Sequence, residues 1–187
     1  DSCMRLTVQL TAAQDVYFNY RQLLSTGYRH DNCQFYMPGF WYRRNLRSPK
    51  KAPSFHTSDS WLVREDRLSA PLTGIFSEKE KRFMTVNRLD DFSMDALATH
   101  KEGEIILSGK TSLGFTGFEN QQGIAMLSFG FPYREAPKSY IRKLTLAPEV
   151  EAFQLMKKGE SVLLTWEIME SGADDFSDFI QHTWEHC

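Results

Sequence analysis

The chain has 187 residues, of which 41% are hydrophobic and 25% are charged, and its formal net charge at pH 7 is −2. This length suits one globular domain with a sizeable core, and the near-neutral charge favours neither nucleic acid nor an anionic membrane as a partner. No apolar run approaches the roughly 18 residues of a membrane-spanning helix, and the three cysteines lack the spacing of a disulfide framework or a zinc site.

The N-terminal part of the chain begins with a strand pattern. Residues 4–10 (MRLTVQL) alternate apolar and polar side chains, which predicts a half-buried strand. Residues 11–24 fit two interpretations: Thr11 as an N-cap and a shared apolar face favour a helix, whereas residues 15–20 (DVYFNY) also suit a strand. We expect a short helix or turn that leads into a strand.

Residues 34–74 are the segment around which the chain is organised. They combine Phe, Tyr and Trp side chains with arginines, an acidic pair and prolines, and they show neither a helical nor a strand period. A long irregular segment of this kind is usually functional or disordered, and so many aromatic residues argue against disorder. We therefore expect an irregular functional surface here.

Strand patterns separated by turns follow as far as residue 170. Residues 124–131 (IAMLSFGF) are apolar on both faces, which predicts a buried central strand, and residues 161–170 alternate clearly between apolar and polar side chains. Further strands are expected at residues 82–89, 105–108, 140–146 and 150–156. Short strands at this spacing, without intervening helices, predict an all-β fold over residues 1–170, mainly an antiparallel sandwich or barrel.

The C-terminal segment changes to a helical pattern. Residues 173–186 place Phe176, Phe179, Ile180 and Trp184 on one face, with aspartates in the first turns and histidines in the last, as the helix dipole favours. We expect residues 171–187 to form a short linker helix that leads to a domain absent from this sequence. The terminal HTWEH matches a zinc-protease pattern, but no third ligand follows, so we expect no metal site.

Charged residues beside aromatic ones raise three possibilities. The basic residues 43–51 next to Trp41 and Tyr42 are of the kind that binds single-stranded nucleic acid, but no recognition motif accompanies them, and a solvated or docked loop is favoured. Glu65 and Asp66 lie between arginines, which would keep both carboxyls ionised. As neighbours in an extended segment they point to opposite faces, so they cannot form the catalytic pair of a glycoside hydrolase.

The aromatic residues favour carbohydrate contact, because sugar rings pack their C–H groups on aromatic faces while their hydroxyls bond Arg, Asp, Glu and Asn. We expect no catalytic residue, and no cofactor, since Gly114 and Gly117 lack the strand–turn–helix context of a nucleotide-binding loop. The candidate carbohydrate or interface contacts are Trp41, Tyr42, Arg43, Asn45, Trp61, Arg64, Glu65, Asp66 and Arg67.

The order of these segments carries a resemblance to a known family. PGFWYRRN at residues 38–45, WLVREDR at 61–67 and GESVLLTWEIME at 159–170 precede a helix with an acidic start. This arrangement resembles the N-terminal β-supersandwich domain, galactose-mutarotase-like in fold, that precedes the (α/α) toroid barrel of many bacterial glycoside hydrolases. The resemblance implies a non-catalytic domain that packs on the catalytic helical barrel and lends loop residues to its sugar site.

Two other functions compete with this interpretation. One is a stand-alone carbohydrate-binding module, and the other is a small sugar hydrolase or epimerase with a pocket lined by His30, His56, Glu65 and Asp66. The first interpretation predicts that the coding sequence continues past Cys187 into a helical domain.

Overall fold

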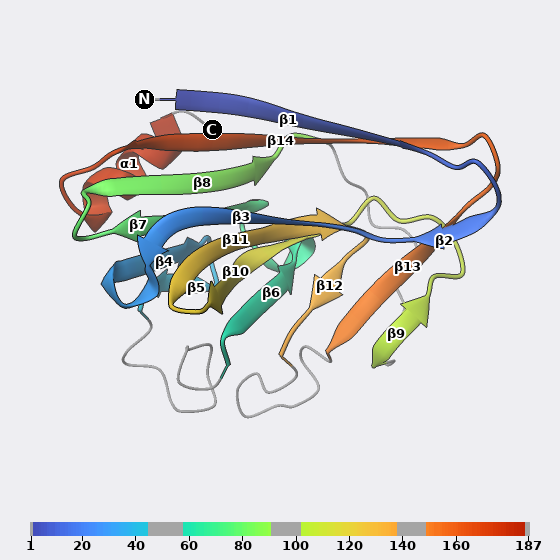
Figure 1. Ribbon diagram of the computed structural model, residues 1–187, viewed down its shortest axis with the longest axis horizontal. Helices are drawn as coiled ribbons and strands as arrows, with labels where there is room; N and C mark the ends of the chain where they lie inside the picture. Colours follow the sequence, from blue (N-terminus) through green and yellow to red (C-terminus); the bar gives the residue numbers. More distant parts are fainter. Residues whose placement is uncertain (1, 45–57, 91–101, 138–148, 186–187) are drawn as a thin grey trace.

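The structure, a computed structural model, describes residues 2–44, 58–90, 102–137 and 149–185. Two sheets face each other across the main core (Figure 1). The larger sheet has the order β1-β14-β8-β7-β4-β5 and contains β1 (Ser2–Thr11), β14 (Ser161–Gly172), β8 (Arg82–Arg88), β7 (Leu72–Ser77), β4 (Cys33–Met37) and β5 (Trp41–Arg43). The second has the order β3-β11-β10-β6 and contains β3 (Tyr20–Arg29), β11 (Ile124–Phe131), β10 (Phe115–Gln121) and β6 (Ser60–Arg64).

A smaller sheet lies at the end of the molecule away from β4 and β5 (Figure 1). It contains β12 (Arg134–Glu135), β13 (Val150–Met156) and β2 (Val16–Phe18), with β9 (Gly103–Ile106) paired in parallel to β13. The other strand pairs of the described residues are antiparallel. The prediction of an all-β, mainly antiparallel sandwich is therefore confirmed.

The C-terminal helix α1 (Phe176–Glu185) packs on the outer face of the six-stranded sheet. Phe179 is fully buried there and its ring lies 4.9 Å from that of Phe83. A side chain at Gly74 would place its Cβ 2.6 Å from Cζ of Phe179, so only glycine allows this approach of helix to sheet. The predicted helix is confirmed, and it begins three residues after the expected start.

Strand β7 shows why the sequence of residues 34–74 lacks the alternation of apolar and polar side chains that is typical of strands. All six of its residues are buried, because one face contacts the main core through Ile75 and the other contacts α1 through Leu72 and Phe76. A strand covered on both faces loses the alternation of apolar and polar side chains.

One prediction about the first half of the chain is wrong. The described parts of the segment 34–74 are not irregular, since they contribute β4, β5, β6, β7 and the 3-10 turn η2 (Glu65–Arg67). There the pairing of strands distant in sequence outweighs the local pattern. Over residues 11–24 the expected turn that leads into a strand is confirmed, because a short turn precedes β2 and β3 and no helix forms.

The remaining strand predictions are confirmed where the structure describes them. Strands at 4–10, 82–89, 124–131, 150–156 and 161–170 correspond to β1, β8, β11, β13 and β14, and β9 covers the first half of the one expected at 105–108. The strand expected at 140–146 lies outside the described residues. Over the described ranges, no helix combines the length and apolar character required to cross a bilayer.

Candidate functional site

Trp41 and Trp61, two of the candidate carbohydrate contacts, lie inside the main core. Their exposed fractions are 0% and 1%, and their ring centroids lie 5.7 Å apart. The ring of Phe118 packs against Trp41 at 5.1 Å in an edge-on geometry, and Nε1 of Trp41 donates a hydrogen bond to the carbonyl of Arg43. Neither indole presents a face to solvent, so carbohydrate contact through these two residues stays a prediction that this packing does not support.

Tyr42 and Arg43 lie on the surface, where edge strand β5 meets the C-terminal helix. Tyr42 is 52% exposed, and its ring packs 5.4 Å from Tyr36. The hydroxyl of Tyr36 accepts a 3.0 Å hydrogen bond from Nε1 of Trp184, which is 46% exposed. The guanidinium of Arg43 lies over the ring of Phe176 at 5.3 Å.

We call Tyr42, Arg43 and Trp184 the β5–α1 patch. It brings two of the candidate residues together with the exposed aromatic side chain of the predicted linker helix. A cation and two amphipathic aromatic rings at one place are typical of residues that contribute most to interfaces. Asn45, the fourth candidate of this segment, lies outside the described residues.

The turn η2 sends Glu65, Asp66 and Arg67 in three directions. The turn is closed by a 3.1 Å hydrogen bond from the backbone N–H of Leu68 to the carbonyl of Glu65. The expectation of an extended segment is therefore wrong. The two carboxylates are nevertheless separated, because Glu65 and Asp66 bond different partners and do not point to one common place.

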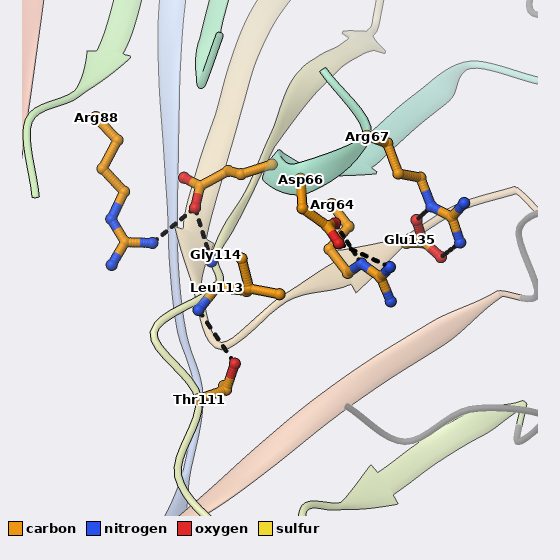
Figure 2. A network of polar contacts seen from close by, with 9 residues as sticks. Arg64, Asp66, Arg67, Arg88, Thr111, Leu113, Gly114 and Glu135 are labelled. Carbon is orange, nitrogen blue, oxygen red and sulfur yellow. Dashed lines mark hydrogen bonds and ion pairs between the residues drawn. The ribbon is translucent and has the colours of Figure 1, made fainter. Parts of the chain in front are cut away.

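Glu65 forms a buried ion pair with a residue from β8. Nη1 of Arg88 and the backbone N–H of Gly114 each donate a 2.7 Å hydrogen bond to Oε2 of Glu65 (Figure 2). The two side chains are 3% and 1% exposed. A Cβ on Gly114 would approach both partners within 3 Å, so glycine is required for the pair to close. Burial raises the pKa of the Glu65 carboxyl, and the nearby Arg88 charge opposes that rise.

Asp66 and Arg67 make separate ion pairs nearer the surface. Arg64 donates two hydrogen bonds to the carboxylate of Asp66, at 2.5 and 2.9 Å, and its guanidinium lies 5.4 Å from the Tyr133 ring. Arg67 pairs through Nε and Nη2 with Glu135 (Figure 2). Burial raises the pKa of the Glu135 carboxyl. These pairs tie η2 to β6 and β12 and thereby hold the turn in place.

Arg88, Asp90 and Glu135 belong to this polar network although they were not among the candidates. Nε of Arg88 bonds Oδ2 of Asp90 at 3.3 Å, and the same oxygen accepts the backbone N–H of Thr165 at 2.8 Å. A signal for Arg88 existed in the sequence, because it shares strand parity with Val86 and is thus a charge at an inward position. For Asp90 and Glu135 the local sequence contains no such signal.

The pocket expected for a small hydrolase or epimerase is only partly described. The ring of His30 packs 5.1 Å from Phe35, and burial lowers the pKa of this imidazole. Glu65 is engaged by Arg88 and Gly114 instead, and His56 lies outside the described residues.

The helix that carries the HTWEH pattern places His182 beside an aspartate. Nε2 of His182 lies 3.6 Å from Oδ1 of Asp178, one turn earlier in α1. In the ranges that the structure describes, no group of three or more His, Cys, Asp or Glu side chains is arranged to hold a metal ion.

Comparison with known proteins adds no family to this description. No protein-family model matches the sequence, and no curated protein matches it. The candidate site therefore rests on the geometry of the chain itself.

Proposed function

We propose that this chain is a non-catalytic N-terminal domain of a carbohydrate-active enzyme, which packs on a catalytic helical barrel and lends loop residues to the sugar site. The observation that carries the proposal is the β5–α1 patch. It joins residues from the arginine- and aromatic-rich segment to the helix that follows the last strand, so a domain attached after α1 would lie next to it.

The chemistry of the patch suits docking of a folded partner. Exposed Tyr and Trp supply large apolar area with little conformational freedom to lose, and Arg is the cation most often found in such interfaces. The hydrogen bond between Trp184 and Tyr36 fixes the indole before any partner arrives. Preorganised side chains lose less entropy on binding, which favours this surface as an interface.

The first test is the coding sequence beyond Cys187. The proposal expects an uninterrupted reading frame that encodes a domain of paired helices. A stop codon shortly after Cys187 would overturn it and leave the stand-alone carbohydrate-binding module as the better candidate.

The second test uses the downstream domain expressed separately and titrated with this chain. Tyr42→Ala and Trp184→Ala should each weaken the complex by about thirtyfold, as expected for interface anchors. Tyr17→Ala is the matched control, because Tyr17 is 50% exposed and lies on β2 at the opposite end of the molecule (Figure 1). Equal effects of the Tyr42 and Tyr17 substitutions would contradict docking through the patch.

A further inference from the structure

A cavity of about 270 Å³ lies between β13 and β14, where the two strands of this hairpin separate into different sheets. Its walls come from five parts of the chain: the ends of β8 and β11, the loop before β10, and the two strands themselves. This volume is just below the roughly 300–1,000 Å³ of sites for drug-sized ligands. It is suited to a compact ligand the size of one sugar ring.

Several polar groups on the walls retain hydrogen-bonding capacity. Arg88 uses Nη1 and Nε for its carboxylate partners, and Gln154 uses Oε1 to accept the backbone N–H of Thr111 at 2.7 Å. Among the described residues, no hydrogen bond involves Nη2 of Arg88, Nε2 of Gln154 or Oδ1 of Asp90. The cavity thus has two side-chain donors and one carboxylate acceptor for a ligand.

The backbone of β14 adds a donor and an acceptor on the same side. The N–H of Thr165 bonds Asp90, and its carbonyl accepts the N–H of Leu89 at 3.0 Å, so the backbone of Thr165 points away from β1. Backbone direction alternates along an antiparallel strand, so N–H and C=O of Leu163 point the same way. At Leu163 the described residues provide no neighbouring strand on that side, since the pairing with β8 begins at Trp166.

The charges and apolar side chains on the walls favour a neutral ligand over an anionic one. Two cations, Arg88 and Lys110, and two anions, Asp90 and Glu160, line the cavity. Lys110 and Glu160 neutralise each other at 2.8 Å. A balanced wall gives no advantage to a phosphate or a carboxylate, whereas Phe131 and Met156 offer apolar contact beside the donors and acceptors.

We propose that this cavity binds one neutral sugar ring, either a free monosaccharide or the terminal residue of a glycan. Only the choice of a sugar among neutral polyols rests on the proposed function. The ring hydroxyls bond Arg88, Gln154, Asp90 and the backbone of Leu163, and the C–H groups pack on Met156 and Phe131.

The test is a titration of the isotope-labelled chain with D-glucose, D-galactose, D-mannose, L-arabinose and inorganic phosphate, followed by amide chemical shifts. At least one sugar should cause saturable shifts at Leu163, Thr111 and Gln154, and phosphate should not. The proposal is overturned if no sugar does so, or if phosphate binds there more tightly than every sugar.

Two pairs of variants locate the binding. Gln154→Glu keeps the acceptor for Thr111 and removes the donor, so it should weaken sugar binding about tenfold. Gln14→Glu adds the same charge in the exposed turn before β2 and should leave the affinity within about twofold. Unchanged binding in Gln154→Glu would contradict the assignment.

Ser161→Trp provides a second test that avoids the buried Gln154. Ser161 is exposed, lines the cavity and pairs with Thr11 at one end of the β1–β14 ladder, so an indole there should fill the site and abolish binding. Ser2→Trp at the other end of the ladder is the matched control and should bind normally. Full binding by a folded Ser161→Trp variant would overturn the proposal.

The outcome for the cavity is separable from the outcome for domain docking. Sugar-dependent shifts in a chain whose coding sequence stops after Cys187 would retain the cavity site and remove the accessory role. A chain that docks through the patch and binds no sugar would remove the cavity site alone.

Discussion

The two halves of β14 pair with the same strand, β1, along one edge and differ in what lies along the other edge. Residues 166–170 pair with β1 and with β8, and their side chains reach the main core through Trp166 and the helix-covered core through Met169. Residues 161–164 pair with β1 alone among the described residues and border the cavity, while Leu164 also reaches the main core. Among the described residues, the neighbour on the second edge of the strand distinguishes the half that pairs with β8 from the half that borders the cavity.

The boundary between the halves is held by charge. Asp90 closes the edge of β14 at Thr165, and Arg88 joins Asp90 to the buried Glu65. A buried charge that loses its partner is costly to the fold. The packed half and the cavity half should therefore respond differently to substitution, and the following variants test this.

The largest effect is expected from Phe179→Ala, which empties the contact between α1 and the six-stranded sheet to which the packed half belongs. Phe179 is fully buried among the rings of Phe76, Phe83 and Tyr36. The free energy of unfolding, measured by denaturant titration, should fall by about 4 kcal/mol. Phe179→Leu should lose less than half as much. Equal losses in the two variants would contradict this expectation, because they would show that an aliphatic side chain recovers none of the packing of the ring.

A smaller loss is expected from Glu65→Ala at the boundary. It leaves the guanidinium of Arg88 and the N–H of Gly114 without their buried acceptor. The free energy of unfolding should fall by about 3 kcal/mol. Glu65→Gln retains an acceptor for Gly114 and should lie between Glu65→Ala and the unmodified chain. A Glu65→Ala variant as stable as the parent would show that the pair between Glu65 and Arg88 does not stabilise this boundary.

The smallest effect is expected from Asp175→Ala at the start of α1. The backbone N–H groups of Asp178 and Ser177 donate to this carboxylate and hold the pKa of Asp175 below its usual value. Because the pKa is lower in the folded state, this stabilisation is complete above the unfolded pKa of about 3.9. It is lost as pH falls through the folded pKa.

The difference in Tm between the parent and Asp175→Ala should accordingly be largest near neutral pH and should shrink towards pH 3. Sugar binding in the cavity, measured by amide shifts, should not change in this variant. A Tm difference that grows on acidification would contradict the capping role of this carboxylate.

Many strand positions outside residues 34–74 were predictable, whereas the order of the strands in the sheets and the place of the site residues were not. The sequence of β11 is a continuous apolar run and that of β14 alternates, so the burial of both strands could be predicted from their own residues. Trp41 and Tyr42 are neighbours with identical local context, yet one is in the core and the other on the surface. This distinction depends on which sheet covers β5, and no local pattern contains that information.

The polar network shows the same limit for charged residues. Glu65 and Asp66 were predicted to be separated by an extended backbone, but the 3-10 turn separates them, and the partner of Glu65 comes from β8. Pairing between residues distant in sequence is set by tertiary packing. The sequence could show only that Arg88 is a charged residue at a core-facing position of a predicted strand, and it could not show the partner of that charge.

The burial of the tryptophans has an optical consequence. Trp41, Trp61 and Trp166 are at most 1% exposed, whereas Trp184 is 46% exposed. A water-soluble collisional quencher should therefore reduce the emission of Trp184 selectively, and any molecule that covers the β5–α1 patch should shield it. The chain thus carries an intrinsic fluorophore at the surface proposed for docking, and occupancy of that surface can be followed without a label.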